Sequence, residues 1–241
     1  MARAEQLAKV QSAQSSEETL RHLYDDARRE LIAGKYDSAR TTFTRLAGEA
    51  QNKQPLLNWI RLHRGLANLL RGYTTQARQA FEELEKAGPF STKAEEKSLA
   101  DFFPQTARTM NAAEPVPATV ARVPAAAGPQ VFALFLFAVK DWQQSDFANA
   151  AGLFEQFQRS QSVGAYTWIN DYKPVAEKFL ADYRVYADWK NQAQSFKGRE
   201  QITAAVTALR AAQGKLQLRG RLNEAFKDEE TKLVRQLEEK K

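Results

Sequence analysis

Apolar residues recur along most of the chain at the three- and four-residue spacing of an amphipathic helix. One stripe of this kind is formed by Trp59, Leu62, Leu66 and Leu69. No segment shows the alternation of apolar and polar residues that is typical of a strand, and valine and isoleucine are scarce. Alanine, leucine and long polar side chains, which lose little conformational freedom in helices, dominate instead. The pattern therefore predicts an all-α fold.

A spaced set of small and aromatic residues occurs three times within this helical pattern. The first copy is Gly34, Ala39, Phe43 and Leu46. The second copy repeats it 38 residues later as Gly72, Ala77, Phe81 and Leu84. In the third copy the turn position and the spaced positions after it are held by Ser145, Ala150, Phe154 and Phe157. Three copies in one register predict three structural units of similar build.

The residue types in this register indicate a pair of packed helices in each unit. Glycine or serine breaks the first helix at a tight turn. The alanine that follows lets the second helix approach the first closely, and the phenylalanine fills the space between units. We therefore expect antiparallel helix pairs, with further helices forming a C-terminal extension.

This register resembles the tetratricopeptide repeat, a pair of antiparallel helices of about 34 residues. The resemblance implies an α-solenoid whose first helices line a concave, ligand-holding surface. It also implies a small residue in each first helix, at Ala27, Gly65 and Ala138. Arg61 and Arg64 depart from the family pattern, since they stand where apolar residues are usual.

Proline usage suggests two helical regions. Residues 112–130 hold four of the eight prolines and are otherwise rich in alanine, which predicts a loop or linker. Residues 1–111 before it form the N-terminal repeats, and residues 131–241 after it form the third repeat and a helical tail. A capping box at Thr92–Glu95 predicts a further helix in the first region, which ends at Pro104.

The tail is expected to contain three helices, at 172–189, 199–213 and 216–240. The last of them carries a spaced apolar set: Leu222, Phe226, Leu233 and Leu237. This set fits either a short coiled-coil seam or the buried face of a capping helix. Glu229 and Glu230 fill the slot between its halves, which favours the capping helix.

Charge and composition restrict the compartment and the partner. The chain has 35 basic and 29 acidic residues, for a net charge of +6, and the two signs are interspersed. This balance permits contact with nucleic acid without requiring it. No secretory signal is visible at Met1–Gln14, and the most apolar stretch, Val131–Val139, is too short to span a bilayer. We expect a cytoplasmic protein, or a periplasmic one if a signal or anchor has been trimmed.

No catalytic or metal-binding motif stands out. Cysteine is absent, and His22 and His63 are not paired at a metal-binding spacing. We expect both histidines to be solvated or capping residues. Adjacent acidic residues point about 100° apart on a helix and do not converge on one site. The sequence therefore predicts no enzyme activity, no cofactor and no metal.

A basic stripe is the first candidate binding feature. Arg61, Arg64, Asn68 and Arg71 follow one another at intervals of 3, 4 and 3, which places them on one helix face. Guanidinium groups in such a row suit an acidic peptide, a terminal carboxylate or phosphates. The alternative is a solvated face that neighbouring glutamates neutralise.

Tyr24 and Arg28 are the second candidate. They fall on the side that resembles the concave surface of the repeat family, although ordinary amphipathic surface is the alternative. The lysine, asparagine and arginine set with which some family members bind chaperone tails is missing. The leading hypothesis is a non-catalytic protein–protein interaction scaffold or adaptor that holds a peptide or helix. The alternatives are a nucleic-acid-binding protein that uses the basic helix face, and a regulatory or assembly segment of a larger bacterial envelope protein.

Overall fold

The computed structural model describes residues 2–86, 94–116, 128–193, 199–218 and 220–239. Within these ranges the regular structure is entirely helical, which confirms the all-α fold. The chain divides into two compact units, residues 1–113 and 114–241. No helix among the described residues is long and apolar enough to cross a membrane.

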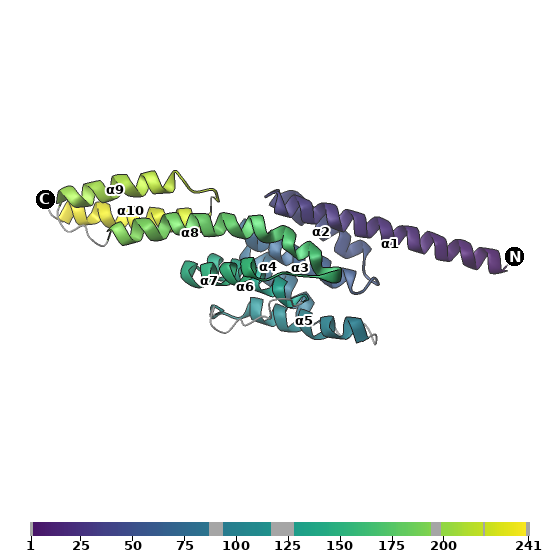
Figure 1. The fold of residues 1–241 in the computed structure, drawn as a ribbon. Coiled ribbons are helices and arrows are strands. Elements are labelled where there is room, and N and C mark those ends of the chain that lie inside the picture. The colour runs from purple at the N-terminus through teal and green to yellow at the C-terminus, as the bar shows by residue number, and fades with distance from the viewer. Residues whose placement is uncertain (1, 87–93, 117–127, 194–198, 219, 240–241) are drawn as a thin grey trace. The chain divides into compact units, whose positions relative to one another are not determined.

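Five helices form the first unit, and each packs against the next along the chain (Figure 1). They are α1 (Ala2–Ile32), α2 (Tyr36–Glu49), α3 (Leu56–Arg71), α4 (Thr74–Glu85) and α5 (Ala94–Asn111). The third helix also contacts α1 and α5, so it touches every other helix of the unit.

The second unit continues the same sequential packing. Its elements are α6 (Gln130–Gln143), α7 (Phe147–Arg159), the 3₁₀ helix η1 (Gly164–Tyr172), α8 (Lys173–Ala193), α9 (Arg199–Gln213) and α10 (Arg221–Glu239). A cluster of aromatic side chains joins α6, α7 and α8, with the rings of Phe154 and Phe179 stacked at a centroid distance of 4.7 Å.

Three helix pairs are closed by turns of the same geometry. Gly34, Gly72 and Ser145 all adopt left-handed backbone, with φ of 81°, 84° and 66°. The N–H of each of these residues donates to the carbonyl three residues back, at 3.0, 2.9 and 3.1 Å. The N–H of the following residue donates to the carbonyl five residues back, at 2.9, 2.8 and 2.9 Å. This is the Schellman arrangement, which satisfies carbonyls at the end of a helix.

The second helix of each pair also begins in the same way. Lys35, Tyr73 and Asp146 precede these helices with φ between −82° and −86° and ψ of 59°, 70° and 67°. Their carbonyls accept the first helical hydrogen bonds, from the N–H groups of the spaced alanines. The three copies found in the sequence therefore follow one backbone path. Serine costs more than glycine in left-handed backbone, and Ser145 Oγ accepts a hydrogen bond at 2.9 Å from Nε of Arg221 on α10.

The spaced alanines and phenylalanines of all three copies are buried. The tightest contact lies between α3 and α4, where Gly65 faces the ring of Phe81. A Cβ atom on Gly65 would lie 2.6 Å from Cε1 of Phe81, closer than real contacts allow. Because Phe81 is itself buried, its ring has little room to retreat, and this crossing requires glycine.

Two helix boundaries differ from those expected from the sequence. Helix α5 continues through Pro104 to Asn111 instead of ending at the proline. A proline inside a helix removes one backbone hydrogen bond, but Phe102 and Phe103 beside it are buried against Trp59, at ring distances of 5.7 and 4.9 Å. This apolar contact holds α5 on α3 on both sides of the interruption.

Helix α10 begins at Arg221, not at residue 216. The residues before it are held in a loop, because the buried carboxylate of Asp182 accepts the N–H groups of Gln217 and Leu218 at 2.7 and 2.8 Å. Burial raises the pKa of Asp182, and these two hydrogen bonds oppose that shift. A long-range polar contact thus sets a boundary that local periodicity could not indicate.

Part of the predicted linker is bound to the second unit. Val116 N–H donates to both carboxylate oxygens of Asp141 on α6, at 2.9 and 3.1 Å, and Lys140 Nζ donates to the carbonyl of Glu114 at 2.7 Å. Burial raises the pKa of Asp141 to about 6. Residues 117–127 of the linker lie outside the described residues.

Replacing Gly65 by alanine is expected to lower the free energy of unfolding by about 1–3 kcal/mol, because the added methyl overlaps the Phe81 ring. Gly48 is the matched control, since it also lies in a helix but has open space around its Cα. Gly48→Ala is expected to raise the free energy of unfolding by about 0.5 kcal/mol, through lower backbone entropy in the unfolded chain. Urea denaturation of both variants checks this, and equal effects would contradict the tight α3–α4 crossing.

Candidate functional site

Helix α3 is the most enclosed element of the first unit. Twelve of its 16 residues are buried, because α1, α2, α4 and α5 all pack against it. Three arginines of this helix nevertheless reach the surface: Arg61, Arg64 and Arg71. The helix therefore presents a small charged surface on an otherwise apolar body.

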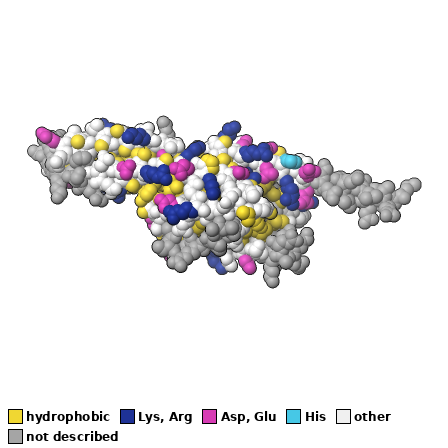
Figure 2. Space-filling view, in the orientation of Figure 1, with side chains coloured by type: hydrophobic (Ala, Val, Ile, Leu, Met, Phe, Trp, Pro, Cys, Tyr) yellow, Lys and Arg dark blue, Asp and Glu magenta, His cyan; other side chains and the backbone are white. Residues whose placement is uncertain are grey.

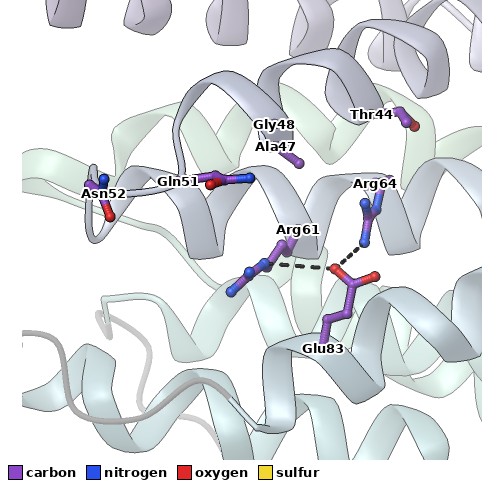
Figure 3. Close-up of a pocket in the computed structure, with 8 residues that line it drawn as sticks. All are labelled: Thr44, Ala47, Gly48, Gln51, Asn52, Arg61, Arg64 and Glu83. Atoms are coloured by element: carbon purple, nitrogen blue, oxygen red, sulfur yellow. Dashed lines mark hydrogen bonds and ion pairs between the residues drawn. The ribbon is translucent and has the colours of Figure 1, made fainter.

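Arg61 and Arg64 converge on one carboxylate of α4 (Figure 3). Arg64 Nη2 lies 2.6 Å from Oε2 of Glu83, and Arg61 Nε lies 3.8 Å from the same oxygen. The arginine side chains are 16% and 25% exposed, whereas Glu83 is 50% exposed. The guanidinium groups are thus more shielded from water than the carboxylate that they share.

These three residues line an open pocket of about 490 Å³. Helix α2 contributes Thr44, Ala47 and Gly48, and the connection from α2 to α3 contributes Gln51 and Asn52. Two arginines and one glutamate leave the lining with a formal charge of +1, since the other five residues are neutral. None of the lining residues comes from α1 or α5.

The other two members of the predicted stripe lie apart from this pocket. Arg71 Nε is 3.0 Å from Oδ2 of Asp37 on α2, and its guanidinium lies 5.9 Å from the centre of the Tyr73 ring. Asn68 is buried, and its carbonyl accepts the Tyr73 N–H that closes the turn. The structure therefore brings Arg61 and Arg64 together, while Arg71 and Asn68 belong to the turn after α3.

Tyr24 and Arg28 are not on an open face. Each is only 8% exposed. Tyr24 Oη lies 3.1 Å from Nδ1 of His63 on α3, and the Arg28 guanidinium covers the Tyr24 ring at 5.6 Å while it pairs with Asp25 at 3.0 Å. These residues fasten α1 to α3. Helical spacing placed them on the correct face of α1, but it could not show that another helix covers that face.

His63 differs from the expected solvated histidine, because it is fully buried. Its Nδ1 lies 2.8 Å from the carbonyl oxygen of Trp59, which can only accept, so Nδ1 carries the proton of this contact. Its ring also packs on Tyr24 and Phe43, at centroid distances of 5.3 and 5.6 Å. Burial, assisted by the charge of Arg28, lowers the pKa of His63 to about 3. The imidazole is therefore neutral near pH 7 and acts in packing.

A second pocket, of about 350 Å³, lies in the other unit between the start of α7 and α8. Phe147, Tyr183 and Tyr186 form its apolar part, and Lys190 lies 5.5 Å from the Tyr186 ring centre. Its charged residues, Asp146 and Lys190, cancel. In the described parts of the chain, no three histidine or acidic residues lie close enough to hold a metal ion.

The depressed pKa of His63 predicts a specific acid sensitivity. The unfolded chain takes up this proton near pH 6.5, whereas the folded chain takes it up only near pH 3. Stability is therefore complete above pH 6.5 and is lost as the pH falls toward 3, with a limiting slope of about 1.4 kcal/mol per pH unit.

His63→Gln removes this titration, so its free energy of unfolding is expected to fall less steeply between pH 6.5 and 4 than that of the wild type. His22→Gln, at an exposed position, is the control and should leave the slope unchanged. Urea denaturation at several pH values measures both slopes. Parallel curves for the wild type and His63→Gln would show that His63 is not buried in neutral form.

Known proteins offer no template for this site. No protein-family model matches the chain, and neither a curated protein nor a solved structure matches it. The functional argument therefore depends on the chain's own residues.

Proposed function

We propose that the first unit is a non-catalytic scaffold of tetratricopeptide type that binds a segment of a protein partner. The supporting observation is the shared geometry of the turns at Gly34, Gly72 and Ser145, each of which closes a helix pair in the same register. Helix-pair repeats of this kind bury a continuous core between neighbours and leave an extended surface for ligands.

The pocket beside Arg61 supports a binding role for this surface. Its lining comes from α2, α3 and α4, so a ligand seated there contacts two consecutive helix pairs at once. A volume of about 490 Å³ falls within the range of about 300–1,000 Å³ that is usual for ligand sites. The opening is wide, which suits a segment of chain better than an enclosed small molecule.

The six candidate residues divide into two roles in this proposal. Arg61, Arg64 and Arg71 reach the surface and contact the partner. The buried residues Tyr24, Arg28 and Asn68 hold α1 and the turn after α3 in position. The proposed surface thus lies where α3 is exposed between α2 and α4.

A protein partner is favoured over nucleic acid by the local charge balance. Binding to a phosphate backbone depends on basic side chains that exchange their counterions for phosphates. Here Arg61 and Arg64 share Glu83, and Arg71 is paired with Asp37. The face is therefore partly neutralised, as expected for a surface that selects one peptide by local contacts.

Affinity capture tests this proposal. The full chain, immobilised and exposed to a nuclease-treated lysate of its source organism, is expected to retain a protein partner that free chain competes away. The triple variant Arg61→Glu, Arg64→Glu, Arg71→Glu should lose that partner. Quantitative mass spectrometry of the retained proteins measures the loss.

The matched control is the triple variant Arg21→Glu, Arg29→Glu, Arg78→Glu. It makes the same change of charge at three exposed, ion-paired arginines of the same unit and should keep the partner. Absence of any competed protein would contradict the scaffold function. Equal retention by both triple variants would contradict the assignment of the surface.

A further inference from the structure

We infer that the pocket between α2, α3 and α4 binds a carboxylate group of an acidic peptide segment, and that Glu83 occupies the place of this carboxylate when no partner is bound. The inference rests on the proposed scaffold function and names the chemistry of the partner. It follows from the contact geometry, the charge and the accessibility of Arg61, Arg64 and Glu83.

The contact geometry leaves binding capacity unused. Both arginines meet the same oxygen of Glu83, Oε2, one at 2.6 Å and the other at 3.8 Å. Arginine and carboxylate bind more strongly when two N–H groups meet two oxygens in parallel. Glu83 achieves this with neither guanidinium, whereas a carboxylate entering from the pocket is not tied to the backbone of α4 and can adopt it.

The charge of the pocket selects an anion. The two guanidinium groups exceed the single carboxylate by one charge, and the remaining lining residues are neutral. Thr44, Gln51 and Asn52 add hydroxyl and amide groups that can bond to the backbone of a peptide. Figure 3 shows Arg61 and Arg64 on the same helix, both directed toward Glu83 across the pocket.

Burial makes these arginines different from the other ion-paired arginines of the unit. Arg21 and Arg78 pair with glutamates on their own helices and are 59% and 70% exposed, so water screens them and the pairs contribute little. Arg64 is 16% exposed, and its charge is screened less. A ligand carboxylate at Arg64 therefore gains more than one bound to an ordinary surface arginine.

Glu83 is suited to give way. Its side chain is half exposed, so release into water restores its hydration at small cost. Exchange of one carboxylate for another also keeps the guanidinium groups paired throughout. Glu83 then acts as an internal competitor, which keeps affinity for isolated acidic groups low and reserves binding for a segment that makes further contacts.

Peptide titration of the full chain by isothermal calorimetry tests the inference. One probe is an acetylated, amidated peptide of alternating glutamate and alanine, which carries only side-chain carboxylates. A second is acetylated polyalanine with a free C-terminus, and a third is inorganic phosphate. Binding of either peptide supports the site, and the stronger one identifies the source of the carboxylate.

Two variants with matched controls locate the site. Glu83→Gln removes the competitor and is expected to tighten peptide binding about tenfold, whereas Glu82→Gln, the same change of charge at the adjacent residue, should have little effect. Arg64→Gln should abolish binding, and Arg78→Gln should not. Thermal unfolding of each variant confirms that it is folded under the conditions of the titration.

Several results would overturn the inference: no binding of either peptide to Glu83→Gln, equal tightening by Glu82→Gln, or binding that survives Arg64→Gln in a folded protein. Phosphate binding as strong as peptide binding would show a general anion site and would also overturn it. A partner captured by the full chain, together with any of these results, would leave the scaffold function standing and remove only the carboxylate site.

Discussion

The left-handed turn that closes each helix pair is the constraint on which the arrangement depends. Positive φ at Gly34, Gly72 and Ser145 reverses the chain after the first helix, and the following carbonyl starts the second helix at a fixed distance. That distance brings a small residue to the helix crossing and a phenylalanine to the space between pairs. In the middle pair the fit is tight enough that Gly65 admits no side chain against Phe81. Register, packing and the exposed faces of the helices all follow from these few backbone bonds.

The sequence predicted the features that depend on local spacing. The all-α fold, the turn positions and the buried alanines and phenylalanines were expected, since each follows from helical periodicity and turn chemistry. Even Ser145 was assigned to a turn despite the absence of glycine. The site was predicted in part: Arg61 and Arg64 do lie on one face of one helix.

Contacts between distant segments could not be predicted in this way. Spacing shows which face of α1 carries Tyr24, but not that His63 of α3 covers it. It shows that Arg64 is on a face with Arg61, but not that Glu83, 19 residues away, reaches both. Asp182 likewise holds a loop 35 residues further along the chain. In each case a polar side chain meets a partner on another element, and no local pattern in the sequence carries that information.

The account makes the exposed part of α3, between α2 and α4, the place where a partner binds. Hydrogen–deuterium exchange of the full chain, with and without its captured protein partner, tests this most directly. The account predicts that the partner slows exchange mainly in the pocket-lining residues 44–52, where the end of α2 and its connection to α3 are solvent-accessible. Slower exchange confined to residues 114–241, with none in residues 44–52, would contradict it.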